Sequence, residues 1–178
     1  AYEANKSEFA DFAEFATFAD PGTDYPCFPE SVFSGLPEIL EKSITLGKAL
    51  GERERDVQFL GNAVVISGMF PNVEVSYPPG KYSPNLFAFV VAPPASGKGI
   101  LMKARLLGKG LHEQMKAESK VFFVPGNVTS AALIDKLAQN DGLASIVEAE
   151  ADALVESLKQ DYGGHSYIFR NAFQHETT

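Results

Sequence analysis

The sequence predicts an α/β fold in which a parallel sheet is flanked by helices and preceded by a helical N-terminal extension. Continuous apolar runs, typical of strands buried on both faces of a sheet, occur at 86–91, 121–124 and 143–147. Each run is followed by a segment with helical periodicity. The alternation of strands and helices indicates parallel strands joined by right-handed crossovers.

The composition is that of a folded protein without a membrane span. The 178 residues are 45% hydrophobic and 21% charged, which supplies apolar side chains for a core and excludes a disordered chain. No apolar run approaches the roughly 20 residues of a membrane-spanning helix, and no secretory signal begins the chain. We therefore expect a cytoplasmic protein with no membrane partner. The lone Cys27 excludes an intramolecular disulfide, and three spaced histidines offer no metal motif.

The net charge of −8 is unevenly distributed along the chain. Residues 92–120 contain two acidic and six basic side chains, whereas 1–56 and 121–178 are acidic. A basic segment in an acidic chain can hold a phosphate group, but it argues against non-specific coating of nucleic acid. We interpret the basic side chains beyond residue 100 as a solvated helix face, with a nucleic-acid groove as the alternative.

The N-terminal extension, residues 1–35, contains an apolar stripe with helical spacing. Four phenylalanines recur every three residues opposite acidic side chains, at Phe9, Phe12, Phe15 and Phe18. This pattern predicts an amphipathic helix over 5–19 that packs on its own domain. The alternative is a helix that binds a partner or a membrane surface.

Residues 36–178 are predicted to form one α/β domain. Apolar spacing and capping residues place its helices at 36–46, 52–69, 100–120, 129–138 and 151–159, followed by a last amphipathic segment at 166–173. Thr129 or Ser130 can cap the fourth of these helices. A short or edge strand is expected at 72–77, where apolar and polar residues alternate before Pro78-Pro79-Gly80.

The residues after the first apolar run carry the candidate chemistry. Residues 92–99, APPASGKG, approximate the phosphate-loop pattern G-x-x-x-x-G-K-[ST] between an expected strand and helix. Gly97 and Lys98 match, whereas Ala92 and Gly99 replace the first glycine and the hydroxyl residue. The backbone amides of such a loop surround phosphates, and its lysine reaches the outer ones. We predict an ATP site formed by Ala95, Ser96, Gly97, Lys98 and Gly99. The alternative is a glycine-rich turn with a solvated lysine.

Acidic residues near the third apolar run supply candidate partners for the phosphate loop. If a strand continues through residues 145–152, Glu148 and Glu150 point to the same side. Glu150 is the candidate for polarising the attacking water, with Lys98 as the second catalytic residue, and Glu148 is the candidate Mg²⁺ ligand. The missing hydroxyl at Gly99 leaves NTPase activity open. Alternatively, these acids only stabilise the start of the next helix.

Three runs, FVVAPPASGKG, FFVPGNVTSAALIDKLAQNDG and SIVEAEADALVESLKQDYG, resemble a family of bacterial domains of unknown function with a degenerate P-loop. Such domains occur in mobile-element proteins beside primase-like or helicase-like modules. The resemblance spans 36–176 and implies a P-loop NTPase fold of the RecA/helicase-like kind. It also implies a nucleotide-binding module of a DNA-processing protein, in which DNA is reached through the full-length protein. The positions to which it points are Gly97, Lys98 and Glu150, with Ser96 and Glu148 as secondary ones.

The domain is expected to be a partial one, truncated at its C-terminus. About 87 residues follow the first apolar run, too few for the remaining strands, a sensor residue and an arginine finger. We therefore expect turnover to require C-terminal parts of the same protein or a homo-oligomer. The alternative function is a non-catalytic scaffold or protein-interaction domain that has lost NTPase activity.

Overall fold

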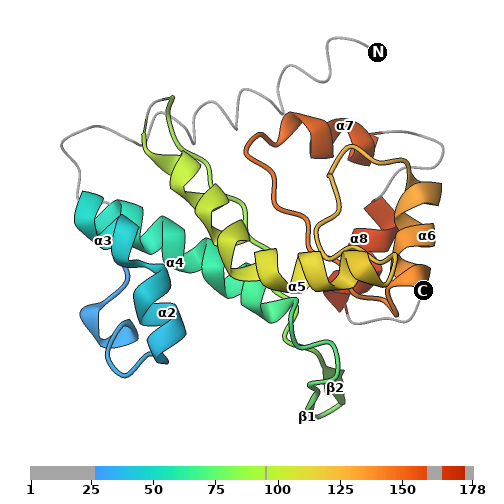
Figure 1. The fold of residues 1–178 in the computed structure, drawn as a ribbon, viewed down its shortest axis with the longest axis horizontal. Coiled ribbons are helices and arrows are strands. Elements are labelled where there is room, and N and C mark those ends of the chain that lie inside the picture. The colour runs from blue at the N-terminus through green and yellow to red at the C-terminus, as the bar shows by residue number, and fades with distance from the viewer. Residues whose placement is uncertain (1–26, 95, 160–165, 175–178) are drawn as a thin grey trace.

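The computed structural model describes residues 27–94, 96–159 and 166–174, which are mostly helical (Figure 1). The elements in chain order are two 3₁₀ helices, seven α-helices and two strands: η1 (Glu30–Val32), α2 (Glu38–Ser43), α3 (Thr45–Leu50), α4 (Glu52–Ser67), β1 (Val75–Tyr77), β2 (Gly80–Tyr82), η2 (Lys98–Ala104), α5 (Arg105–Ala117), α6 (Ser130–Gln139), α7 (Asp152–Lys159) and α8 (Ser166–Gln174). Within these residues the one sheet is the antiparallel pair β1–β2.

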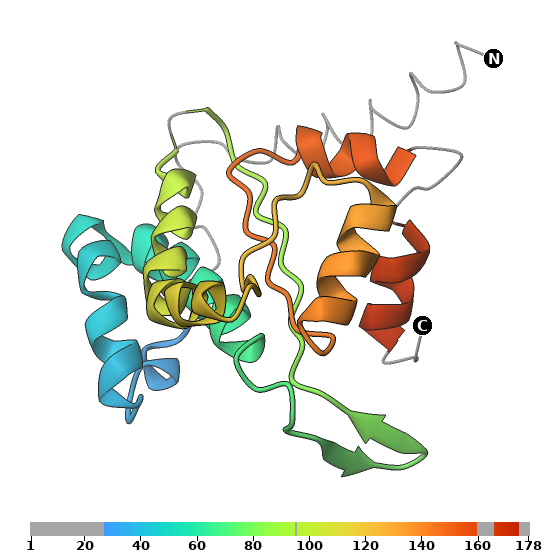
Figure 2. The same ribbon diagram turned by 45° about the vertical axis from the view of Figure 1, so that its right-hand side comes forward.

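The predicted fold class is therefore wrong. A partial P-loop NTPase-type parallel sheet flanked by helices is not formed in the described part of the chain. Segments 121–125 and 143–147 do run side by side, but they share one parallel bridge, between Phe123 and Ser145 (Figure 2). The amide of Val124 donates to the carbonyl of Ser145 at 3.0 Å, and the amide of Ser145 donates to the carbonyl of Phe122 at 2.8 Å. An apolar run indicates that a segment is buried, whereas a strand also requires a neighbouring backbone in register along its length.

The first apolar run, 86–91, is not a buried strand either. It runs without regular secondary structure beside α4, where the amide of Leu86 donates to Ser67 Oγ at 3.1 Å. Phe87, Phe89 and Val91 are 48%, 65% and 65% exposed. The expectation of burial on both faces is wrong, because Phe89 and Val91 are mostly exposed and Phe87 stays half-exposed although its ring packs edge-on against Phe173 of α8.

The expected strand at 72–77 is present only at its end, as β1 of a hairpin that projects from the helical body (Figure 1). Val75 pairs with Tyr82 and Tyr77 with Gly80. The two strands are joined by Pro78-Pro79, whose peptide bond is cis.

Most predicted helices are confirmed with small changes of boundary. The expected helix at 36–46 is divided at Ile44 into α2 and α3, and the one at 100–120 begins as the 3₁₀ helix η2 and continues as α5. Thr129 caps α6 as expected, because its Oγ1 accepts a hydrogen bond from the amide of Ala132 at 3.2 Å. The helix predicted at 5–19 lies outside the described residues.

The residues before α2 are attached to α4 by an aromatic cluster and a buried arginine. The rings of Phe28 and Phe33 pack edge-on against Phe59 at centroid distances of 5.7 and 5.2 Å. Arg55 is buried, forms ion pairs with Glu30 and Asp56, and stacks its guanidinium 4.0 Å from the centre of the Phe33 ring. This arrangement fixes the entry of the chain beside the N-terminal end of α4.

The core consists of two apolar clusters. The first contains Val65, Ala104, Met115, Phe122, Phe123 and Val147. The second contains Val124, Leu133 and Ile168. Segments 121–125 and 143–147 contribute to both clusters, so they connect the helices α4, η2 and α5 with α6 and α8.

Candidate functional site

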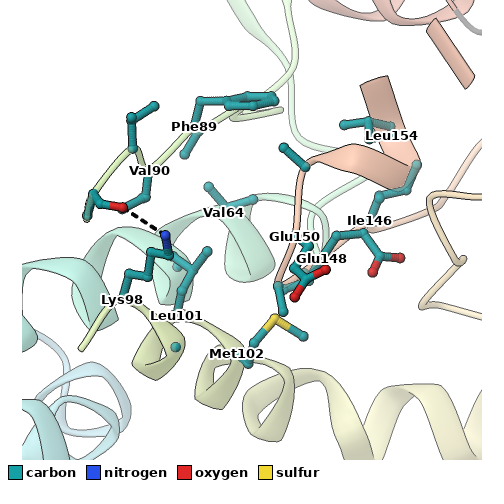
Figure 3. Close-up of a pocket in the computed structure, with 18 of the residues that line it drawn as sticks. Val64, Phe89, Val90, Lys98, Leu101, Met102, Ile146, Glu148, Glu150 and Leu154 are labelled. Atoms are coloured by element: carbon teal, nitrogen blue, oxygen red, sulfur yellow. Dashed lines mark hydrogen bonds between the residues drawn. The ribbon is translucent and has the colours of Figure 1, made fainter. Parts of the chain in front are cut away.

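A cavity of about 670 Å³ brings the loop at 96–99 together with the acidic segment 148–152. The rest of its wall comes from residues 88–92 and from apolar residues of the neighbouring elements: Gly61, Val64, Leu101, Met102, Ile146, Val147 and Leu154. In Figure 3, Lys98 at the start of η2 lies across the cavity from Glu148 and Glu150. Pockets that bind small molecules have volumes of this order, about 300–1,000 Å³.

The loop is held in a closed shape by its own lysine and glycine. Lys98 Nζ donates to the carbonyl oxygen of Ala92 at 2.8 Å, which joins the two ends of the loop (Figure 3). Gly97 has φ +82°, and a Cβ there would lie 2.7 Å from Glu54 Oε1. Both the left-handed backbone and the close carboxylate require glycine at this position.

The remaining predicted loop residues differ in their surroundings. Ser96 lines the cavity, and its Oγ is buried without a hydrogen-bond partner among the residues that the structure describes. A buried hydroxyl without a partner is costly, so a polar ligand or a water that reached it would be favoured. Gly99 also lines the cavity, and nothing lies within 4 Å of a Cβ built on it. Ala95 lies outside the described residues.

The two predicted glutamates lie on the acidic side of the cavity in different environments. Glu148 is half-buried, and its Oε1 accepts a hydrogen bond from the amide of Gly126 at 2.7 Å. Glu150 is exposed, as is Asp152, which also lines the cavity. The structure thus brings both predicted glutamates to the cavity that contains Lys98, although the strand from which their common side was inferred is not formed.

The cavity carries an excess of negative charge. Its charged lining residues in the described part are one lysine and three acids: Lys98, Glu148, Glu150 and Asp152. Behind the loop, the hydrogen bond from Arg53 holds the pKa of the Glu54 carboxyl below its usual value, so this group is ionised at neutral pH. A polyanion entering this cavity therefore needs an accompanying cation.

The acidic residues do not form a metal cage by themselves. Among the described residues, no group of three or more His, Cys, Asp or Glu side chains is placed to hold a metal ion. Mg²⁺ bound with a nucleotide usually takes one or two carboxylates together with phosphate oxygens and water. Glu148 and Glu150 fit that limited role, and with a phosphate present they could hold the ion beside the loop.

Two residues that shape the site were not predicted from the sequence. Glu54 contacts the loop at Gly97, and Gly126 fixes the carboxylate of Glu148. Neither has a signal in the sequence, since each acts through a contact between segments far apart in the chain.

Comparison with known proteins gives no match: no family model, curated protein or solved structure matches this chain. The resemblance to mobile-element domains accordingly stays a prediction. In the described part of the chain, no helix is both long enough and apolar enough to cross a membrane.

Proposed function

We propose that the cavity binds a nucleotide through its phosphate groups, with ATP and Mg²⁺ as the ligand pair. The observation that carries the proposal is the cavity itself, which joins the loop of Lys98 to Glu148 and Glu150, about 50 residues away in the chain. From the sequence, the lysine was predicted to bind phosphate, Glu148 to bind Mg²⁺ and Glu150 to polarise the attacking water. All three line the same cavity, whose volume is in the range of small-molecule sites.

The charges of the cavity support a metal–nucleotide complex over a free nucleotide. Lys98 supplies a cation for the outer phosphates, and Ser96 has a hydroxyl free to bond a phosphate oxygen. Three carboxylates would repel the same phosphates. Mg²⁺ placed between the phosphates and Glu148 turns that repulsion into attraction.

Hydrolysis is a separate proposal, which concerns Glu150 and Gly99. Glu150 is exposed at the cavity, so it has the freedom to approach a water molecule beside the phosphates. Gly99 lacks the hydroxyl that ordinarily helps to hold Mg²⁺ in such a loop. We expect nucleotide binding by this chain with hydrolysis close to background. A role within a DNA-processing protein stays a prediction from the resemblance.

The test is thermal unfolding with ATP, in the presence and absence of Mg²⁺. A ligand that binds only the native state stabilises it by RT ln(1 + [L]/Kd), about 2.7 kcal/mol at 100 times Kd. We expect a rise in Tm that requires Mg²⁺ and disappears in Lys98→Ala. Lys103→Ala is the matched control, because Lys103 is an exposed lysine on the same helix that does not line the cavity.

Two further variants test the binding of Mg²⁺ and the role of Glu150 in hydrolysis. Gly99→Ser fits without a clash and should lower the Mg²⁺ concentration required for half of the Tm shift. Glu150→Gln should leave the shift unchanged and remove any residual hydrolysis. No shift at millimolar ATP with Mg²⁺, or equal shifts in Lys98→Ala and Lys103→Ala, would contradict the proposed function.

A non-catalytic interaction domain is the second candidate, and one observation favours it. Phe87, Phe89 and Val91 are exposed together on one segment, a feature typical of a docking surface. The thermal experiment separates the two functions, because an interaction domain without a nucleotide site gives no Mg²⁺-dependent shift.

A further inference from the structure

Segment 86–91 carries exposed apolar side chains that the described elements cover only in part: Leu86 is 52% exposed, and the ring of Phe87 packs edge-on against Phe173 of α8 at a centroid distance of 5.8 Å. Alternate residues of the segment form an apolar face that stays largely open. We define it by Phe87, Phe89 and Val91, which are 48%, 65% and 65% exposed, while the intervening Ala88 and Val90 are half-buried. Alternate residues of an extended chain point to the same side, so these three side chains share one side. The segment carries no charged residue. Large exposed apolar groups in succession indicate a surface that another element covers.

The same chain contains an apolar stripe with helical spacing, and the apolar side of an amphipathic helix packs against another apolar surface. Phe9, Phe12, Phe15 and Phe18 recur with helical spacing, with Glu8, Asp11 and Glu14 between them. Residues 1–26 lie outside the described part. We propose that the phenylalanine stripe of segment 5–19 docks on the apolar face of Phe87, Phe89 and Val91 in the same molecule.

The path of the chain places segment 5–19 within reach of this face. The amide of Phe28 donates to Asp56 Oδ2 at 2.6 Å, so the N-terminal segment enters the described part at the first turns of α4. Two residues earlier on α4, Glu54 contacts Gly97. Segment 86–97 thus runs along α4, from Ser67 at one end to Glu54 at the other. The chain enters at the end that lies beside the loop.

Lengths and charges agree with this placement. The seven residues 20–26 can span up to about 25 Å when extended, and a helix over 5–19 is about 22 Å long. The six residues 86–91 extend over roughly 20 Å. Since the apolar face has no charge to pair with Glu8, Asp11 and Glu14, the acidic side of the helix turns to solvent. Phe89 and Val91 also line the cavity.

Amide hydrogen exchange of the full chain, measured by mass spectrometry without nucleotide, tests this docking. The double variant Phe12→Ala/Phe15→Ala weakens the stripe, and Asp11→Asn/Glu14→Gln alters only its acidic side. We expect exchange at 86–91 to accelerate by about tenfold or more in the phenylalanine variant and to stay unchanged in the control. Exchange at α5 and α6 reports whether the variant remains folded.

The reciprocal variant Phe89→Ser supplies an independent measurement on the other side of the contact. It should accelerate exchange at 5–19, because the helix loses its docking surface, while α5 and α6 keep their protection. Three results would each overturn the proposal: unchanged exchange at 86–91 in the phenylalanine variant, unchanged exchange at 5–19 in Phe89→Ser, or a dimer that covers the face. Light scattering after gel filtration detects the dimer, whose formation would depend on Phe89 and not on Phe12 and Phe15.

Discussion

His112 shows how one side chain connects two segments of the core. Its Nδ1 accepts a hydrogen bond from the amide of Phe123 at 3.2 Å, and its ring lies 5.5 Å from that of Phe123. The acceptor exists only in the neutral imidazole. Burial lowers the pKa of His112 below its usual 6.5, and the charge of Lys116 lowers it further. The charge of Glu113 opposes this decrease, and Arg105 adds a smaller lowering effect.

The lowered pKa predicts a loss of stability in acid. Below pH about 6.5 the unfolded chain binds a proton at this position that the native protein does not bind. The contribution of His112 is therefore fully present above that pH and is lost as the pH falls. Urea unfolding at pH 7.5 and 5.5 should give a larger decrease in stability for the native sequence than for His112→Gln, whose amide oxygen can accept the same bond without titrating. Equal decreases would contradict this role.

At the scale of an element, α5 places two glycines in opposite surroundings. A Cβ on Gly108 would lie 2.5 Å from Phe123 Cζ and 2.8 Å from Phe122 Cε1, whereas nothing lies within 4 Å of one on Gly110. Gly108 allows α5 to approach the aromatic residues of the first cluster. Gly110 is exposed and has no such function in packing.

Alanine substitutions at these two positions should have opposite effects on stability. Gly108→Ala gains helix propensity but overfills the contact with two rings, so we expect a net loss of about 1–3 kcal/mol. Gly110→Ala keeps the propensity gain and should stabilise by about 0.5–1 kcal/mol. Urea unfolding of both variants gives the comparison. Stabilisation by Gly108→Ala would show that α5 does not pack this closely on Phe122 and Phe123.

At the scale of the whole molecule, the two apolar clusters share their central segments. In the segment 121–125, Phe122 and Phe123 belong to the first cluster and the adjacent Val124 belongs to the second. In the segment 143–147, Val147 belongs to the first cluster and Ile146 packs against the second. Asn140 binds Val121 from the end of α6, accepting a bond from its amide and donating to its carbonyl oxygen. We therefore expect the helices on both sides to unfold together.

Leu133 of α6 provides the test of this coupling. It is 2% exposed in the second cluster, and Leu133→Ala should destabilise the protein by about 2–5 kcal/mol. Its neighbour Ile134 is 43% exposed, and Ile134→Ala is the control, with a change of about 0.5 kcal/mol or less. Hydrogen exchange at α5, in the first cluster, should accelerate in Leu133→Ala to the same extent as at α6. Acceleration confined to α6 and α8 would mean that the clusters unfold separately.

Local features of the sequence were sufficient to predict most helices and to locate the glycine and lysine of the loop. Helices α4, α6 and α7 follow from apolar spacing, and Thr129 is recognisable as a cap because capping depends on a side chain three residues from its partner. Gly97 and Lys98 were identified in the same way, since their pattern is contained in eight consecutive residues. Such features act over a few residues, so the sequence by itself determines them.

Only the tertiary structure decided whether the apolar runs form strands and which side chains contact the loop. The runs at 86–91, 121–124 and 143–147 predicted a sheet, but strand formation depends on register between segments 20 or more residues apart. Likewise, the partner of Glu148 is Gly126, and the carboxylate beside Gly97 comes from Glu54. Backbone pairing, burial and the charge of a cavity are set by contacts between distant segments, which periodicity and motifs do not encode.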